Sequence, residues 1–419
     1  MEVILVRYPA LRNRDFALIL VGRTLSAFGN QFNMLALSLV VYRVTGSVAA
    51  LGGMLAARVA SRLFIQLGAG VLVDRLNLKR MLLTAELVNA VVAAALIYAA
   101  RPELVWLVYV LVFILQSVEG FTGPGLNAGL TMVLDKDELP SGNALRLISG
   151  RVAALLGPAL AGVLFAAYGP ALLFGANAAS FLLSFLFLVF VRSLTGPQGQ
   201  RERAPFLRSL VEGFKVIGSM PQLLTVIVLV GAAAMVWGVL QIAIIPMAEG
   251  PLHLDERGLG LLFTTLALGG LAGSFVTPLI ARGVRTEVAL AFTYLLVCIP
   301  FLTVVIYPLA AVAFVVMFLN GLLADSAGIF STTTLQTLTP PTHLGRVFAL
   351  MNVSMALGVL PVVLFVQPLV DRYGPEGPLA VAAVLMALFS GAALYYLTVK
   401  WRRGEVSGEQ MEAGVASVD

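Results

Sequence analysis

The sequence predicts an all-α membrane protein with twelve transmembrane helices in two pseudo-symmetric six-helix bundles. Hydrophobic residues make up 59% of the 419 residues and charged residues 12%, with a mean hydropathy of +0.96. That charge content is about half that of a soluble domain. The apolar residues gather in runs of about 20 or more, the length of a helix that crosses a bilayer. A water-soluble fold is excluded, and little room is left for a separate soluble domain.

Twelve apolar runs divide into two sets of six. The first set predicts helices over residues 16–42, 48–73, 80–100, 104–126, 143–167 and 171–191, and the second over 222–248, 257–281, 287–306, 309–333, 345–370 and 378–399. Residues 1–191 are therefore expected to form an N-terminal bundle and residues 222–399 a C-terminal bundle. Residues 192–221 form a polar linker, in which apolar residues recur at the spacing of an amphipathic helix. Residues 400–419 are a polar tail.

The loops alternate between cation-rich and cation-poor. One set carries Arg12, Arg75, Lys79, Arg80, Lys136, Arg146, Arg201, Arg203, Arg282 and Arg346, among others, and the other set carries only Arg43, Arg101, Arg257 and Arg372. By the positive-inside rule, both termini and the linker are expected in the cytoplasm, with the chain crossing the cell (inner) membrane many times. A shift of 203 residues places Gly142 on Gly345 and Pro158 on Pro361, as two related halves would.

Several kinds of site are not supported. The net charge of +5 comes from cations in short loops, so it reports topology and indicates no nucleic-acid partner. Cys298 is the only cysteine, and His253 and His343 are expected on opposite sides, so neither a metal centre nor a catalytic cluster is expected. We expect no enzyme activity and no cofactor. The expected partners are the lipid bilayer, protons and a small-molecule substrate, and the expected state is a monomer.

The stretch Gly70-Val-Leu-Val-Asp74-Arg75-Leu-Asn-Leu-Lys79-Arg80 resembles the signature loop of the major facilitator superfamily, G-x-L-x-D-R-x-G-R-[KR]-[KR]. The second glycine of that pattern is Asn77 here, and the next arginine is Leu78. The resemblance implies gating roles for Gly70, Asp74, Arg75 and Arg80. Asp74 would contact the N-terminus of the helix beginning near Gly345, worth about 0.3–1 kcal/mol, and so latch one conformation. In the alternative interpretation, the charges of the loop only fix topology.

A longer stretch resembles the macrolide-efflux and enterobactin-exporter branch of the same superfamily. It runs from Leu139-Pro-Ser-Gly-Asn-Ala-Leu145 through Gly157-Pro158-Ala-Leu-Ala-Gly162 to Asn177-Ala-Ala-Ser180-Phe181. Gly157, Pro158 and Gly162 also resemble an antiporter motif of helix 5, which implies gating. Pro158 removes one helical hydrogen bond, and glycine lets a facing helix approach closely. Ordinary use of Gly and Pro in membrane helices is the alternative.

Two positions depart from the family pattern. Members of the branch often carry an acidic residue in helix 1 where this chain has Asn30, which questions a proton site there. The superfamily's helix 4 motif has an arginine where this chain has Gln116. We expect both residues to line the substrate cavity.

Seven ionisable residues fall inside the expected spans: Arg23, Arg58, Arg62, Glu86, Glu119, Arg151 and Asp325. Each would cost about 2.5–3.5 kcal/mol at mid-membrane if it were uncompensated. Arg23 and Glu86 lie within about two turns of the cytoplasmic ends, which favours snorkelling or pairing at the surface. The other five lie deeper.

We expect Glu119 to pair with arginines of the first half and to couple transport to protons, because a carboxylate in a partly dry cavity can be poised to titrate. A fixed structural ion pair is the alternative. Asp325 is the second proton-site candidate, against local hydrogen bonding to Ser326, Ser331 or Thr332. Arg58, Arg62 and Arg151 are expected in the cavity, where they would favour anionic or zwitterionic substrates.

The leading hypothesis is a secondary active transporter that exports amphipathic small molecules, drug-like or siderophore-like, by proton antiport with alternating access. Such an activity would confer multidrug efflux. An alternative on the same fold is uptake or flipping of an anionic metabolite or lysophospholipid, which the arginines would suit. A membrane protein that transports nothing is the third possibility.

Overall fold

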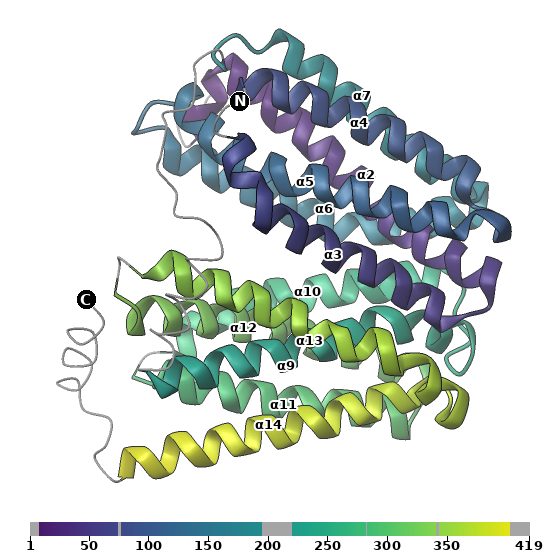
Figure 1. Cartoon of the computed structure of the whole chain (residues 1–419), viewed down its shortest axis with the longest axis vertical. Helices are drawn as coiled ribbons and strands as arrows, with labels where there is room; N and C mark the ends of the chain where they lie inside the picture. The colour runs from purple at the N-terminus through teal and green to yellow at the C-terminus, as the bar shows by residue number, and fades with distance from the viewer. Residues whose placement is uncertain (1–7, 74–76, 195–219, 282, 341–342, 403–419) are drawn as a thin grey trace. The chain divides into compact units, whose positions relative to one another are not determined.

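The computed structural model describes residues 8–73, 77–194, 220–281, 283–340 and 343–402 (Figure 1). Within these ranges the chain forms twelve long α-helices and no strand. The expected amphipathic helix of the linker, most of the tail, and Asp74 and Arg75 lie outside the described residues. The expectation of an all-helical protein in two six-helix sets is confirmed.

The first six helices are α2 (Arg14–Thr45), α3 (Val48–Val73), α4 (Leu78–Ala99), α5 (Val105–Val133), α6 (Leu139–Tyr168) and α7 (Pro170–Phe190). Short 3-10 turns, η1 (Pro9–Arg12) and η2 (Pro102–Leu104), precede α2 and α5. The second six are α9 (Pro221–Glu249), α10 (Glu256–Ile280), α11 (Thr286–Ile306), α12 (Ala310–Leu338), α13 (Leu344–Tyr373) and α14 (Glu376–Arg402).

The helix lengths repeat between the two sets. Helices α3 and α10 have 26 and 25 residues, α4 and α11 have 22 and 21, α5 and α12 have 29 each, and α6 and α13 have 30 each. This repetition agrees with the weak sequence match at a shift of 203 residues. The helix lengths therefore support the expectation of two related halves.

The apolar runs located most helix ends to within about four residues. The largest differences are at α5, which continues to Val133 instead of 126, and at α12, which continues to Leu338 instead of 333. Both extensions contain polar residues such as Asn127 and Thr337. Hydropathy marks the part of a helix that suits lipid, whereas the helix itself continues as long as its backbone bonds do. Equivalent helices of the two repeats share this extension.

Ten of the described helices are long and apolar enough to span a membrane. Helices α2 and α3 are not among the ten. Helix α2 carries Asn30, Gln31 and Asn33 near its middle, which lower its hydropathy. Polar residues inside a membrane helix are often functional, so the middle of α2 is a candidate part of the site.

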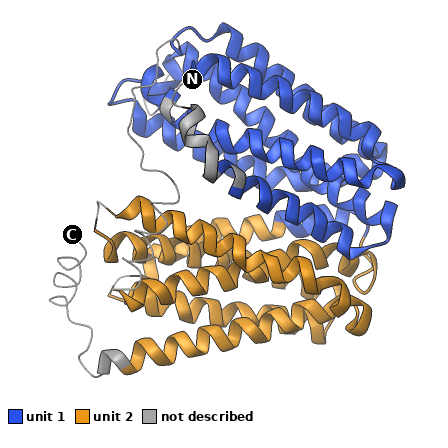
Figure 2. Cartoon of the chain, viewed as in Figure 1, with its two compact units in different colours: residues 1–203, 255–264 blue, residues 204–254, 265–419 orange. Residues whose placement is uncertain are grey.

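The chain divides into two compact units (Figure 2). Unit 1 contains residues 1–203 and 255–264, and unit 2 contains residues 204–254 and 265–419. In unit 1, α7 packs against α2 and α4, α3 packs against α5, and α2 packs against α6. In unit 2, α11 packs against α12 and α14, and α13 packs against α9.

One end of unit 1 is held together by a helix cap and by hydrogen bonds between helix ends. Asn77 caps α4, since its side chain accepts a 3.1 Å hydrogen bond from the backbone of Arg80. Asp15 accepts hydrogen bonds from Ser193, and Lys79 donates to the carbonyls of Val189 and Val191. The beginnings of α2 and α4 therefore meet the end of α7. The asparagine that departs from the family's loop pattern serves as a helix cap.

Candidate functional site: a polar network inside unit 1

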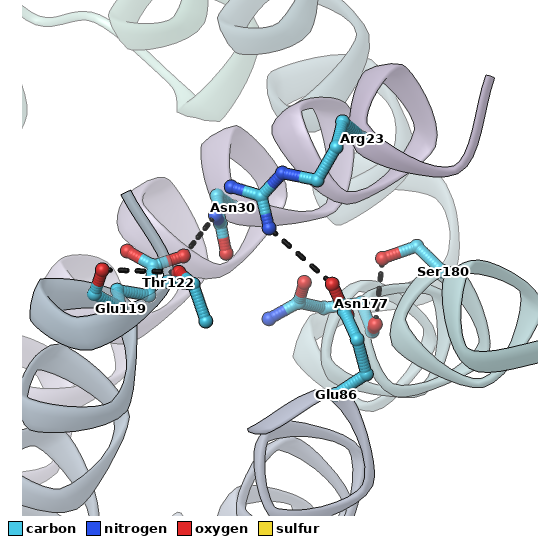
Figure 3. A network of polar contacts seen from close by, with 7 residues as sticks. All are labelled: Arg23, Asn30, Glu86, Glu119, Thr122, Asn177 and Ser180. Atoms are coloured by element: carbon cyan, nitrogen blue, oxygen red, sulfur yellow. Dashed lines mark hydrogen bonds and ion pairs between the residues drawn. The ribbon is translucent and has the colours of Figure 1, made fainter. Parts of the chain in front are cut away.

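Glu119 lies at the middle of α5 and contacts α2. Its position, fourteen residues from each end of the helix, places it about 21 Å from either end at 1.5 Å per residue. The side-chain amide of Asn30 donates a 2.5 Å hydrogen bond to its Oε1, as Figure 3 shows. The hydroxyl of Thr122 donates to the backbone carbonyl of Glu119 over 3.0 Å. An ionisable group halfway along α5 is thus held by a neutral amide.

One of the two arginines of α3, Arg58, interacts with this carboxylate. Ser61 and Ser117 form a buried 3.0 Å hydrogen bond that fixes α3 against α5. Arg58 interacts electrostatically with both Arg62 and Glu119, and its side chain is half-buried, whereas Arg62 is exposed. Arg58 is thus the arginine that interacts with Glu119, and ion pairing of Glu119 with Arg62 stays a prediction. Gln116 is half-buried one turn before Glu119, on a similar side of α5.

Arg23 and Glu86 form an ion pair inside the bundle. The Nη1 of Arg23 lies 3.3 Å from Oε1 of Glu86, and the Glu86 side chain is 2% exposed (Figure 3). The hydroxyl of Ser184 on α7 lies beside the same carboxylate, and Glu119 is close enough to interact with it electrostatically. The expectation of a surface pair or of snorkelling was wrong for Glu86, because α2 and α7 cover it.

The seam between α2 and α7 is made of small and polar residues. On α2, Gly22, Ser26, Gly29 and Asn33 are buried along one stripe at helical spacing. A Cβ on Gly29 would lie 2.3 Å from the Ser180 hydroxyl, and one on Gly22 would lie 3.0 Å from that of Ser184. The glycines therefore let the polar side chains of α7 approach the backbone of α2. This seam was not predicted, although Asn177, Ser180 and Ser184 recur at the three- and four-residue spacing of one helix face.

Asp325 lies in unit 2, on α12. Its side chain is half-buried and faces α10, where a Cβ on Gly270 would lie 3.0 Å from the carboxylate. Of the suggested local partners, Ser326 binds the carbonyl of Leu322 and the hydroxyl of Thr277, and Ser331 binds the carbonyl of Gly328. These two hydroxyls are thus engaged elsewhere, and a proton-site role for Asp325 stays a prediction.

Gly157, Pro158 and Gly162 lie in the buried part of α6. A Cβ on Gly157 would come within 2.6 Å of Gln31 on α2. One on Gly162 would come within 2.4 Å of the Glu256 carbonyl, in the part of α10 that belongs to unit 1. The predicted close approach of helices at these glycines is seen, and their gating role stays a prediction.

The remaining predicted site residues are scattered. Arg151 is exposed on α6, Arg80 is exposed in the first turn of α4, and Gly70 lies in the last part of α3. Asp74 and Arg75 lie outside the described residues. The structure thus brings Asn30, Arg58 and Glu119 together, and the roles of all the predicted site residues stay predictions.

Curated relatives of the chain include exporters. The enterobactin exporter EntS of Citrobacter koseri is 25% identical over 299 residues, which cover 69% of each chain. EntS of Escherichia coli O1:K1 is likewise 25% identical over 299 residues. These proteins agree with the branch that the sequence resembles.

Solved structures share the fold. The nucleoside transporter NupG has a TM-score of 0.73 at 11% identity and covers 92% of this chain and 99% of its own. A bacterial homologue of the human lysosomal transporter Spinster has a TM-score of 0.68 at 12% identity and covers 96% and 94%. The model of the Major Facilitator Superfamily matches residues 19–363. The chain therefore belongs to the Major Facilitator Superfamily and is a multi-pass membrane transporter.

Proposed function

We propose that this protein exports amphipathic small molecules, drug-like or siderophore-like, in exchange for protons. The observation that carries the proposal is Glu119, an ionisable side chain halfway along α5 that accepts a hydrogen bond from Asn30 and interacts electrostatically with Arg58. Its insertion at that depth would cost about 2.5–3.5 kcal/mol without compensation. Such residues are functional by default in membrane helices, and proton transfer is a common role. The printed name of the relative EntS supports export.

A proton on Glu119 would change the contacts that hold three helices together. The ionised carboxylate attracts Arg58 on α3 and accepts the hydrogen bond of Asn30 on α2. Hydrogen bonds to a charged group contribute about 1.5–3 kcal/mol, against about 0.5–1.5 for a neutral one. Protonation therefore loosens α2 and α3 from α5. A loosening of this size is sufficient to shift an equilibrium between two conformations about tenfold.

The arginine pair favours a second candidate, uptake or flipping of an anionic metabolite or lysophospholipid. The ionised Glu119 would compete with an anionic substrate for Arg58 and Arg62. A proton on Glu119 would remove that competition, so proton and anion would bind together and move in the same direction. A neutral or cationic substrate is not attracted by the freed arginines, so it is compatible with exchange for protons. The direction of proton movement relative to the substrate therefore distinguishes the two candidates.

The test is substrate-dependent proton flux in liposomes that contain the purified chain and a pH-sensitive dye. Macrolide antibiotics, siderophores and lysophospholipids are the candidate substrates. Exchange predicts that protons move opposite to the substrate, and co-transport predicts that they move with it. Proton movement with none of the compounds, together with no movement of the compounds themselves, would indicate a protein that does not transport them. The proposal also places the chain as a monomer in the cell (inner) membrane, with both termini in the cytoplasm and no cofactor.

A further inference from the structure

We propose that Glu86 is a second proton-binding site, which passes protons between the α4 end of unit 1 and Glu119. The inference rests on the proposed proton coupling and adds a residue that the sequence assigned to the membrane surface. It starts from the depth of the two carboxylates. Glu86 lies eight residues into α4, about 12 Å from its start, and Glu119 lies about 21 Å from either end of α5. A proton entering at that end meets Glu86 first.

The charges that face Glu86 come from two neighbouring helices. Arg23 on α2 forms the 3.3 Å ion pair, and Glu119 on α5 is the other charged group that interacts with it. Helix α7 contributes the hydroxyl of Ser184 and has no ionisable residue between Pro170 and Phe190. Arg23 is therefore the cation beside Glu86, whereas Arg58 is the cation that interacts with Glu119. With both carboxylates ionised the two charges repel each other, so a proton bound at one favours ionisation of the other.

The buried atoms around Glu86 are suited to carry a proton. Several side chains on α2, α4 and α7 have polar atoms without a hydrogen-bond partner among the described protein atoms: Ser26 Oγ, Asn33 Oδ1, Asn89 Oδ1, and both Oδ1 and Nδ2 of Asn177. All four residues are buried. Each such group would cost about 1–3 kcal/mol in a dry interior. Water molecules satisfy groups of this kind in proteins, and a hydrated polar seam provides the path between carboxylates.

A structural ion pair between Arg23 and Glu86 would leave these atoms unexplained. A structural pair needs partners only for its two charges. Helices α2, α4 and α7 contribute further buried polar side chains that such a pair does not require. Glu287 in unit 2 shows what a fixed pair looks like. It is buried and accepts two hydrogen bonds from the neighbouring Arg285, of 2.8 Å and 2.5 Å. Glu287 is therefore the matched control for Glu86.

The first experiment reads protonation directly. Dicyclohexylcarbodiimide modifies protonated carboxyl groups in apolar sites, and peptide mass spectrometry locates the product. The purified full chain is treated at about pH 6 and about pH 9, which bracket the range in which buried carboxyl groups titrate. We expect strong modification of Glu86 at the lower pH and little at the higher, with Glu287 unmodified at both. No modification of Glu86, or equal modification at both pH values, would overturn the proposal. This readout stands even if no substrate drives proton flux.

The second experiment reads coupling. We expect Glu86→Gln to lose the substrate-dependent proton flux and to flatten its dependence on pH, and Glu86→Asp to restore part of both. Glu287→Gln should keep the wild-type pH profile. Wild-type pH dependence in Glu86→Gln would show that the pair is only structural. If the wild-type chain itself moves substrate without protons, the proposed function fails, and the carbodiimide result still decides whether Glu86 binds a proton.

Discussion

The side chain of Asn30 on α2 donates a 2.5 Å hydrogen bond to the carboxylate of Glu119 on α5. The position at which related exporters often carry an acid thus holds a neutral donor that stabilises an acid on another helix. The resemblance to the exporter branch put a proton site at this position of helix 1 in doubt, and Glu119 places a carboxylate at the same contact.

Replacing Asn30 by Leu should weaken transport and keep the fold. The change removes the only neutral side-chain donor that the described contacts give to Glu119, so about 1.5–3 kcal/mol of stabilisation of the carboxylate is lost. We expect a fall in transport rate of about tenfold or more. Asn143→Leu, at an exposed position of α6, is the control. Equal transport by the two variants would contradict the role of Asn30.

Gly29→Ala should destabilise unit 1 at the seam between α2 and α7. The new methyl group would lie 2.3 Å from the Ser180 hydroxyl and 3.1 Å from the Cα of Asn177. Overpacking of this kind costs about 1–3 kcal/mol. We expect a lower melting temperature in detergent. Gly150→Ala, where no atom lies within 4 Å of the added methyl, should leave it unchanged. Equal melting temperatures for the two variants would contradict the close packing of α2 and α7 at Gly29.

Asp15→Asn should loosen the end of unit 1 where α2 meets the end of α7. Asp15 Oδ2 accepts hydrogen bonds of 2.8 Å from the backbone of Arg192, and of 2.8 Å and 2.7 Å from the backbone and hydroxyl of Ser193. The neutral amide accepts these bonds more weakly, and the half-buried site reduces the loss to about 1–2 kcal/mol. Faster hydrogen exchange near residue 193 is the measurement. Asp137→Asn in an exposed loop is the control.

Asp74→Asn should slow transport without preventing expression. This prediction comes from the family pattern of the loop, in which the carboxylate is expected at the N-terminus of the helix that begins near Gly345. An interaction of that kind contributes about 0.3–1 kcal/mol, so the effect should be a few-fold. Turnover equal to that of the wild type, at matched protein levels, would argue that the loop charges only set topology.

The sequence predicted the helices well because lipid imposes a single requirement on every span. Each run must be apolar for about 20 residues, and this is visible locally. The contact between Asn30 and Glu119 could not be predicted in the same way, because the two residues are 89 positions apart. No local sequence pattern indicates which helix faces meet. The expectation that Glu119 would associate with arginines rested on the cost of an isolated charge, and that reasoning led to Arg58.

The surface position expected for Glu86 was wrong because its distance from the end of the helix was equated with its distance from water. Eight residues from the start of α4 suggested a surface position, but burial depends on the neighbouring helices as well. Here α2 and α7 cover the side chain. The buried stripe of Leu82, Glu86, Asn89 and Ala93 on α4, with the polar spacing on α7, was the available signal. Polar residues at helical spacing on two or three spans predict an internal polar seam.

The central claim is that Glu119 carries the coupled proton. The most direct measurement compares substrate-dependent proton flux in liposomes for the wild type, Glu119→Gln, and the control Glu103→Gln, whose side chain is exposed in the turn before α5. We predict proton flux with the wild type and with Glu103→Gln, and none with Glu119→Gln. Full proton-driven transport by Glu119→Gln would contradict the account and leave Glu119 as a structural partner of Asn30.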